Sequence, residues 1–406
     1  MKFLGLVKDF IGIPKIVKSL MLSSLALTVA RAMSIPFFAI YLSLEAGLEP
    51  SDIGLFIGSA IFISTATGAI GGMLSDTFGK RAMLLISLLS CSLSLCGLYF
   101  SNSLLLLYLS NLFFNIGYSI FSPVSKSIIS EKVDDSIKVR AFSINYILIN
   151  VGWAVGPLLG VWLTGESNKS IFLAASLIFF LVFLYYLIFV SSEENKGENV
   201  EPPSIYNIFH VLSRDKYLLL FIVGGIVLST VYSQFTVYLS QYFIISDHVT
   251  SAKYLSYMLT TNALCIIFVQ PLIIGYTERI SPNVNIFIGG CLLALGQIGF
   301  FLSGDITHLI IAMVVFSVGE ILIIPNQSVV IDRIAPNEMK GAYFGAQNLQ
   351  TLGYFLCPWI SLLTLERYGS NAMFLTLSGL SVVGALLFAV KRREDFKLSL
   401  KVKQNV

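Results

Sequence analysis

The stretch SLMLSSLALTVARAMSIPFFAIYLSL, residues 19–44, carries a single charge, Arg31. An apolar run of about 20 residues is long enough to cross the hydrocarbon core of a bilayer as a helix. Arg31 lies about a dozen residues into the run, which places it near the bilayer midplane at about 1.5 Å of rise per residue. A charge at that depth is costly and marks a substrate or ion pathway. We therefore expect a membrane protein whose first helix carries a functional cation.

Similar apolar stretches recur along the whole chain of 406 residues, of which 56% are hydrophobic and 12% are charged. Soluble proteins contain about 25% charged residues, so this composition excludes a soluble multidomain protein. Each span should be helical, because no other unclosed structure satisfies its own backbone hydrogen bonds in lipid. The sequence predicts an all-α membrane protein with twelve transmembrane helices, at about 19–44, 53–74, 82–100, 103–128, 139–164, 170–190, 216–243, 252–275, 284–303, 306–329, 340–364 and 370–390.

The positions of Lys and Arg predict how these helices are oriented. With the N-terminus in the cytoplasm, twenty-two of the 26 basic residues fall in inner segments, three fall in outer loops, and Arg31 is the remaining one. The positive-inside rule produces such a bias, and an odd number of spans would remove it. We expect both termini in the cytoplasm. The net charge of +3 reflects loops near anionic headgroups and predicts no nucleic-acid partner.

The longest polar interruption, SSEENKGENVEPPSIYNIFHVLSR at 191–214, follows the sixth predicted span. We interpret it as a cytoplasmic linker between two six-helix halves, 1–190 and 215–391, with a cytoplasmic tail at 392–406. The halves match each other at an offset of 202 residues, which aligns FNIG at 114–117 with FSVG at 316–319 and also pairs Pro123 with Pro325 and Phe142 with Phe344. This register predicts two pseudo-symmetric repeats. Transporters built from repeats place their site near the midplane at the repeat interface.

Between the second and third spans the chain reads GGMLSDTFGKR, residues 71–81. Its glycines permit close helix approach, Asp76 can accept charge-assisted hydrogen bonds, and the basic pair can anchor at the headgroups. An ordinary positive-inside loop explains the basic pair alone. The complete spacing resembles the signature loop of the major facilitator superfamily, G-x-L-x-D-x-x-G-[RK]-[RK]. The resemblance implies a conformational latch that holds the two halves in the outward-open state, formed here by Gly72, Asp76, Gly79, Lys80 and Arg81.

The fifth span contains GWAVGPLLG, residues 152–160. Small residues every four positions let helices pack closely, and an internal proline permits a bend. Such glycine spacing is also common in membrane helices without a special role. The stretch resembles the antiporter motif of the drug:proton antiporter branch of the superfamily, G-x-x-x-G-P-x-x-G-G, with Val161 in place of the last glycine. The matching residues are Gly152, Gly156, Pro157 and Gly160.

A closer resemblance covers most of the chain. The stretches ARAMSIPFFAIYLS, RAFSINYILINVGWAVGPLLG and VGEILIIPNQSVVIDRIAPNEMKGAYFGAQNL look like those of the bacterial inner-membrane dipeptide exporters of the drug:proton antiporter-1 family. The resemblance implies the major facilitator fold, a location in the bacterial inner membrane, and proton-driven export of small peptides or drugs, as in multidrug resistance. It implies no enzyme activity and no cofactor, and we expect a monomer.

Glu320 lies at the centre of the tenth span, so the chain has one midplane cation and one midplane anion. In the resembled fold, spans one and ten line the central cavity with spans four and seven. We expect Arg31 to bind a substrate carboxylate in a bidentate fork, and Glu320 to receive an amino group or the transported proton. A carboxyl in a low-dielectric interior holds its proton more tightly, which suits proton exchange. The alternative without a role in transport is a structural ion pair between Arg31 and Glu320.

Other polar residues of the spans are candidates to bind substrate or proton. Individually, each of them is more often an interhelical hydrogen-bond partner than a ligand. The candidates are Asn115, Tyr118, Asn145, Asn150, Gln234 and Tyr238. The sequence shows no cluster suited to metal binding or to nucleophilic catalysis.

We therefore predict a proton-coupled exporter of dipeptides or small amphipathic drugs that works by alternating access. The first alternative is a proton-coupled importer or facilitator of another small metabolite, which the same fold supports. A membrane sensor without transport activity is the second alternative. A midplane charge pair and the lack of a sizeable soluble domain argue against the sensor.

Overall fold

The computed structural model is helical over the residues that it describes, which are 12–44, 48, 50–163, 169–190, 210, 212–233, 235, 238–239, 242–243 and 251–389. Gln234, the predicted tail and most of the predicted linker lie outside these residues. In the described part, ten helices are long and apolar enough to cross a membrane, and Lys216–Tyr232 is a shorter apolar helix. The last of the ten is interrupted at Gly369 and covers two predicted spans. Each predicted span thus has a helical counterpart, which confirms the all-α membrane fold.

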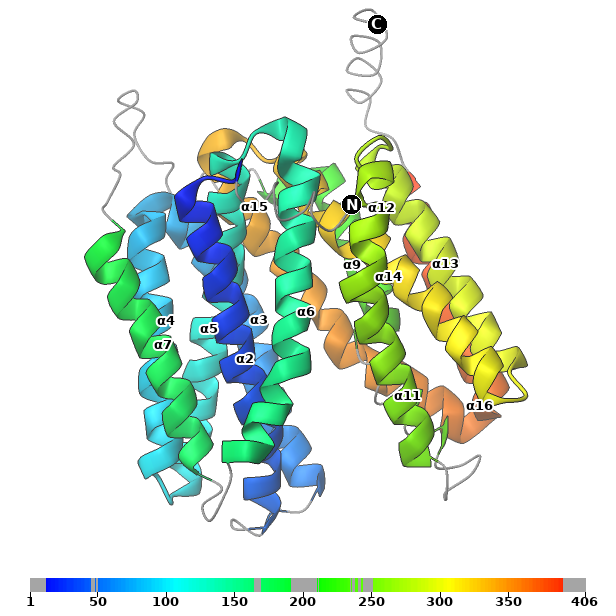
Figure 1. The fold of residues 1–406 in the computed structure, drawn as a ribbon, viewed down its shortest axis with the longest axis horizontal. Helices are drawn as coiled ribbons and strands as arrows, with labels where there is room; N and C mark the ends of the chain where they lie inside the picture. Colours follow the sequence, from blue (N-terminus) through cyan, green and yellow to red (C-terminus); the bar gives the residue numbers. More distant parts are fainter. Residues whose placement is uncertain are drawn as a thin grey trace, which may run out of the picture. The chain divides into compact units, whose positions relative to one another are not determined.

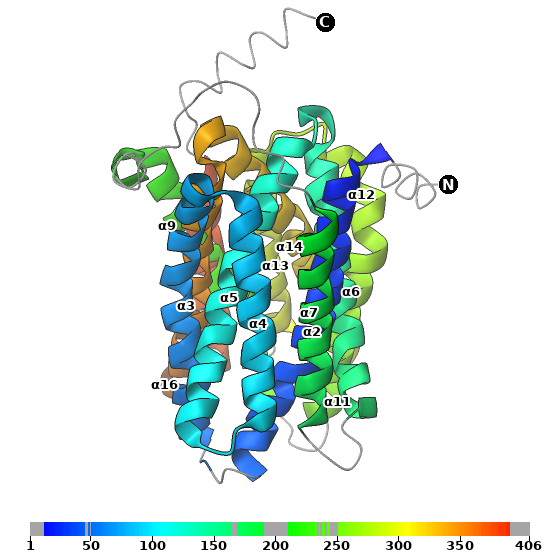
Figure 2. The same cartoon turned by 90° about the vertical axis from the view of Figure 1, so that its left-hand side faces the viewer.

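The N-terminal half consists of six long helices that run side by side (Figures 1 and 2). Helix α2 packs against α6 and α7, α4 packs against α5 and α7, and α3 packs against α5. A single 3₁₀ turn, η1 at Asp135–Ile137, connects α5 to α6. The six helices are α2 (Lys15–Leu44), α3 (Pro50–Phe78), α4 (Lys80–Phe100), α5 (Leu104–Lys132), α6 (Lys138–Leu163) and α7 (Ser170–Phe189).

The C-terminal half is less regular. A π-helical stretch, η2 at Cys265–Val269, separates α11 from α12, and a 3₁₀ turn, η4 at Asn348–Thr351, separates α15 from α16. A third short turn, η3 at Asn337–Met339, precedes α15. The helices are α9 (Lys216–Tyr232), α11 (Ser251–Leu264), α12 (Gln270–Thr277), α13 (Pro282–Leu302), α14 (Ile306–Ile334), α15 (Lys340–Gln347) and α16 (Leu352–Ala389).

Ordinary capping residues begin several of these helices. Asp215 accepts the first free N–H groups of α9, and Ser281 followed by Pro282 begins α13. Asp305 immediately precedes α14, and its carboxylate accepts the N–H groups of Thr307 and His308 in the first turn. These bonds, with that of His308 foremost, hold the pKa of the Asp305 carboxyl below its ordinary value. The sequence therefore specifies these helix starts locally.

The chain forms two compact units that interleave in sequence. The first unit contains Met1–His210 together with Gln270–Ile274 and Ile331–Leu349, and the second unit contains the rest. The end of α14 and all of α15 therefore belong to the unit formed by the N-terminal helices, where α15 packs against α3 and α5 (Figure 1). The predicted linker at 191–214 stays a prediction.

The outer faces of the helices are strongly apolar. Phe100, Leu158 and Phe189 are each more than 70% exposed, and many other large apolar side chains are also exposed. Contiguous exposed apolar surface is rare on soluble monomers and is the surface that lipid requires. Most of the polar and charged residues discussed below are buried between helices instead.

Candidate functional site

Helices α3 and α15 approach each other closely at two glycines. A Cβ atom added to Gly72 would lie 2.6 Å from the Cα of Gly345, and one added to Gly345 would lie 3.0 Å from the Cα of Gly72. Both clashes are with backbone atoms, which cannot turn away as a flexible side chain can. Glycine at 72, one of the predicted latch residues, is therefore required for this helix contact.

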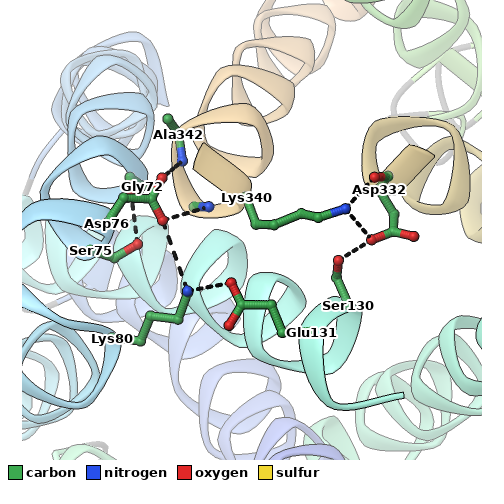
Figure 3. Close-up of polar contacts among 10 residues, drawn as sticks. Gly72, Ser75, Asp76, Lys80, Ser130, Glu131, Asp332, Lys340 and Ala342 are labelled. Carbon is green, nitrogen blue, oxygen red and sulfur yellow. Dashed lines mark hydrogen bonds and ion pairs between the residues drawn. The ribbon is translucent and has the colours of Figure 1, made fainter. Parts of the chain in front are cut away.

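Asp76 binds the N-terminus of α15 (Figure 3). Its Oδ1 accepts the N–H of Gly341 at 2.9 Å, and its Oδ2 accepts the N–H of Ala342 at 2.7 Å. The first N–H groups of a helix have no intrahelical partners and carry partial positive charge. Only 1% of the Asp76 side chain is exposed, so these charge-assisted bonds are shielded from water. The predicted latch aspartate thus fixes α3 to α15.

The other predicted latch residues lie at the turn between α3 and α4. Gly79 has a φ of 93°, in the left-handed region that favours glycine. The Lys80 ammonium lies 4.0 Å from Asp76 and pairs with Glu131 of α5, whereas Arg81 donates to the carbonyl of Leu187 at 2.9 Å. Lys80 therefore belongs to the α3–α15 contact, and Arg81 binds the end of α7.

A second charged cluster, which the sequence analysis missed, surrounds Asp332 near the end of α14 (Figure 3). Its carboxylate lies 2.7 Å from the ammonium of Lys138 and 2.8 Å from that of Lys340, and it accepts the hydroxyl of Ser130. Lys138 also pairs with the exposed Asp135. All three charged groups at the centre are buried or nearly so, so two buried lysines share one buried carboxylate.

The repeat relates the members of this cluster. Lys138 and Lys340 are 202 residues apart, and so are Ser130 and Asp332. Two lysines at equivalent positions of the repeats therefore share the carboxylate of one repeat, while serine occupies the equivalent position of the other. The offset found in the sequence could have revealed part of this cluster, because it pairs Lys138 with Lys340 and Ser130 with Asp332.

Arg31 of α2 is enclosed by aromatic rings. Its guanidinium carbon lies 4.2 Å from the ring centre of Tyr118 on α5 and 5.9 Å from that of Trp153 on α6. Among the described residues of its unit, no acidic side chain lies within ion-pair distance of Arg31, and its buried Nε has no hydrogen-bond partner. Cation–π contact with rings holds a guanidinium without neutralising it. The arrangement can therefore bind an anion. Sequence reasoning had missed Trp153.

The predicted asparagines of α5 and α6 differ in how their amides are used. Asn115 donates to both the carbonyl and the side-chain oxygen of Asn111, which leaves the buried Nδ2 of Asn111 without a partner. Asn145 has a buried Oδ1 that accepts no hydrogen bond in the described part of the chain. Asn150 donates to the carbonyl of Tyr146 one turn earlier in its own helix. Asn145 and the Asn111–Asn115 pair therefore retain unused polar atoms.

Glu320 of α14 is 6% exposed, and its Oε2 accepts the Nδ2 group of Asn262 at 2.6 Å. Among the described residues of its unit, no basic side chain lies within ion-pair distance of it. Asn262 also donates to Ser317, one turn before Glu320 on α14. The carboxyl is therefore held by an amide instead of a cation. Asn262 was missed because a single asparagine in an apolar span carries no distinctive signal.

Two predicted site residues, Tyr238 and Gln234, remain to be placed. Tyr238 is buried, accepts the Nε2 group of Gln297 at 2.7 Å and donates to the carbonyl of Val231 at 3.4 Å. Its hydroxyl is thus fully used inside the protein, which favours a structural role. Gln234 lies outside the described residues.

The glycine motif of α6 packs this helix against α2. A Cβ added to Gly152 would lie 2.8 Å from the Cβ of Thr28, and one added to Gly156 would lie 2.9 Å from the carbonyl oxygen of Val29. Pro157 lies inside the same helix, with Gly160 one turn further on. The motif therefore brings Trp153 close to Arg31.

No group of three or more His, Cys, Asp or Glu that could hold a metal ion occurs in the described ranges. Among the described residues, the charged and polar side chains discussed above belong to three groups. These are the charged cluster around Asp76 and Asp332, Arg31 with the rings of Tyr118 and Trp153, and the Glu320–Asn262 pair.

Comparison with known proteins identifies relatives over almost the whole chain. The family model described as Major Facilitator Superfamily matches residues 20–351. The MFS-type transporter YdeE of Escherichia coli (strain K12) is 31% identical over 378 residues, which cover 92% of this chain and 94% of that protein. A Na(+), Li(+), K(+)/H(+) antiporter of Planococcus maritimus is 24% identical, with 88% of this chain and 91% of the antiporter covered.

A solved structure has the same fold. The crystal structure of a bacterial homologue of the iron transporter ferroportin, in an outward-facing state, superimposes with a TM-score of 0.76 at 14% sequence identity. The superposition covers 93% of this chain and 99% of that one. At this identity the likeness concerns the fold alone.

Proposed function

Because this multi-pass membrane chain belongs to the major facilitator superfamily of transporters, we propose that it is a proton-coupled exporter of dipeptides or small amphipathic carboxylate-bearing compounds. The observation that carries the proposal is the pair of isolated midplane charges. Arg31 and Glu320 are each held by neutral side chains, and among the described residues of its own unit neither has an opposite charge within ion-pair distance. A transporter keeps such charges available for its cargo and for protons.

Arg31 is the proposed receptor for the cargo carboxylate. The rings of Tyr118 and Trp153 orient its guanidinium, which then offers two parallel N–H donors to a carboxylate. The unused polar atoms of Asn111 and Asn145 are available to bind the peptide backbone of the cargo. Aromatic walls also suit amphipathic molecules, because they contribute apolar contact area around the charged group.

Glu320 is the proposed coupling residue. A buried carboxyl without a cationic partner is neutral when it carries a proton and costly when it does not. Proton binding and release at Glu320 therefore change the free energy of the conformations that expose it to each side of the membrane. The relative named as a Na(+), Li(+), K(+)/H(+) antiporter supports exchange against protons in this group of transporters.

The cytoplasmic cluster is the proposed latch. Asp76 binds the start of α15, and Asp332 binds Lys138 at the start of α6. These contacts close the cytoplasmic ends of the helices, and they must break for cargo to enter from the cytoplasm. We place both termini in the cytoplasm of a bacterial cell, with the protein as a monomer in the inner membrane.

A transport assay in proteoliposomes with an imposed proton gradient tests the proposal. The cargo is a labelled dipeptide, and its C-terminal amide serves as the comparison without a carboxylate. Arg31→Ala should lower transport of the free dipeptide at least tenfold and transport of the amide much less, because only the former loses a charge-assisted bond. Glu320→Gln should abolish the response to the proton gradient. Ser34→Ala is the matched control on α2, since its hydroxyl bonds only within that helix.

The outcomes separate the parts of the proposal. Equal losses for both cargoes in Arg31→Ala would mean that Arg31 is a structural residue. Undiminished proton-driven transport in Glu320→Gln would exclude it as the coupling residue. Accumulation of the dipeptide in intact cells would show import instead of export.

A further inference from the structure

The pair formed by Asn262 and Glu320 has a definite donor direction. Ser317 donates its hydroxyl hydrogen to the carbonyl of Met313 at 2.7 Å, so it offers only lone pairs to Asn262, which lies 3.0 Å away. The atom of Asn262 that faces Ser317 must therefore be the donor Nδ2 and not Oδ1. The same Nδ2 then points its second hydrogen at Oε2 of Glu320, 2.6 Å away.

This direction distinguishes the two oxygens of the Glu320 carboxyl. Oε2 accepts a hydrogen from Asn262 and cannot itself carry a proton toward that donor. In the described part of the chain, no group donates to Oε1. While the bond to Asn262 persists, the proton is favoured at Oε1, because a carbonyl oxygen accepts an N–H bond better than a hydroxyl oxygen does.

Other titratable side chains of the described unit also lie near Glu320. The titratable groups that face it are the phenols of Tyr232 on α9 and Tyr238, both buried. Cys265, at the start of the π-helical stretch, is directed at Ser317 instead. The described residues of the unit place no Lys, Arg or His within ion-pair distance of the carboxyl. The Asn262 amide is therefore the principal contact that favours the ionised form.

We propose that Asn262 is a positioning residue for the coupling carboxyl: its amide holds Oε2 of Glu320, favours the ionised form, and directs the transported proton to Oε1. The inference rests on the proposed function, in which Glu320 carries that proton. Asn262 touches neither proton nor cargo. It sets the pH range in which Glu320 exchanges its proton, and Ser317 sets the orientation of the amide.

Infrared difference spectroscopy of the purified full-length protein, between acidic and alkaline pH, tests this directly without knowledge of the cargo. The carboxyl band of protonated Glu320 is identified by its loss in Glu320→Gln. In Asn262→Ala the ionised form loses its donor, so the midpoint of this band should move upward by about one pH unit. Ser317→Ala should move it in the same direction by less, and Asn262→Ser, which keeps a hydroxyl donor, should recover part of the shift.

Asn285→Ala is the matched control. Asn285 is another buried amide of the second unit, and it donates to the backbone carbonyl of Thr277 and to the side-chain oxygen of Asn326. It should leave the midpoint unchanged. An unchanged or lowered midpoint in Asn262→Ala would overturn the inference, and Ser317→Ala decides the matter if Asn262→Ala does not fold.

Failure of the proposed function gives a different result. If Glu320→Gln retained proton-driven transport in vesicles, Glu320 would not be the coupling residue, whatever the infrared midpoint did. If Glu320→Gln lost coupling and Asn262→Ala left the midpoint in place, only the role of Asn262 would be wrong.

Discussion

At the scale of single residues, we expect the loss of the Asp332 side chain to destabilise the fold most. Its carboxylate is the common partner of two buried lysines, and the exposed Asp135 contacts only one of them. Removing one member of a buried ionic group leaves uncompensated charge in a low dielectric, which costs about 3–5 kcal/mol. Replacing the whole group by apolar residues costs far less, because no charge is then left buried.

We expect Asp332→Ala to lower the free energy of unfolding by about 3–5 kcal/mol, measured as a drop in the thermal midpoint of the protein in detergent. Asp134→Ala is the control, because Asp134 is exposed and its side chain makes no capping hydrogen bond. The combination of Asp332→Leu with Lys138→Met and Lys340→Met should regain most of the loss. If the triple variant were as unstable as Asp332→Ala, uncompensated buried charge would not be the cause of the lost stability.

How well a residue could be predicted depended on how unusual it was in its surroundings. Arg31 and Glu320 stand out because a charge inside an apolar run is costly. Asp76 stands out through the spacing of its motif. Asn262 does not, because a neutral amide in a membrane helix usually bonds to a neighbouring helix. Its importance comes from the carboxyl that it meets, and that meeting depends on two helices far apart in sequence.

At the scale of elements, the contact between α3 and α15 depends on missing side chains. Gly72 lies against the backbone of Gly345, and Asp76 on the next turn of α3 reaches the N–H groups of α15. The carboxylate can reach those groups because the helices come so close together. A side chain added at the glycine contact should separate the helices and therefore also break the hydrogen bonds of Asp76 to α15.

Gly72→Ala should open the α3–α15 contact and reduce transport about tenfold or more, corresponding to at least about 1.4 kcal/mol. The measurement is initial transport rate in proteoliposomes, together with the reactivity of a cysteine placed at Ser75, which is 1% exposed in the closed contact. Gly58→Ala on the same helix is the control, because an added Cβ would meet no atom within 4 Å. Equal effects of the two substitutions would mean that lost helix flexibility, and not the contact, is responsible.

The predicted eleventh span shows that the sequence of a helix alone does not determine where the helix is interrupted. A single helix was expected at 340–364, and the structure divides it at the 3₁₀ turn Asn348–Thr351. The reason is tertiary: Ser229 of α9 donates to the carbonyl of Gln350 at 2.6 Å, and Gly225 leaves room for the Gln350 side chain. Apolar periodicity predicts that a helix exists, but partners on another helix decide where it is interrupted.

At the scale of the whole molecule, the apolar runs and the repeat predicted the fold class, since length and hydropathy alone define membrane helices. They could not predict that Ile331–Leu349 belongs with the N-terminal helices. That grouping arises from the contacts of Asp76 and Asp332, which are properties of the folded chain.

The bias of Lys and Arg predicts the orientation of the chain in the membrane. A cysteine at Ser103, between α4 and α5, should react with a membrane-impermeant maleimide in intact cells, whereas one at Asp134 should react only after the membrane is opened. The five native cysteines are replaced first, and the unlabelled parent serves as the control. The reverse pattern would place both termini outside the cytoplasm.

The π-helical stretch Cys265–Val269 lies where the chain passes from the second unit to Gln270 of the first. A π turn holds one residue more than an α turn. Its conversion to an α turn would therefore rotate the preceding helix about its own axis by about 100°. Deleting Ile267 should impose that rotation permanently, carry Asn262 away from Glu320, and raise the pH midpoint of the carboxyl band as Asn262→Ala does; an unmoved midpoint would contradict it. The helical winding of five residues would then decide whether the amide of Asn262 reaches the carboxyl of Glu320.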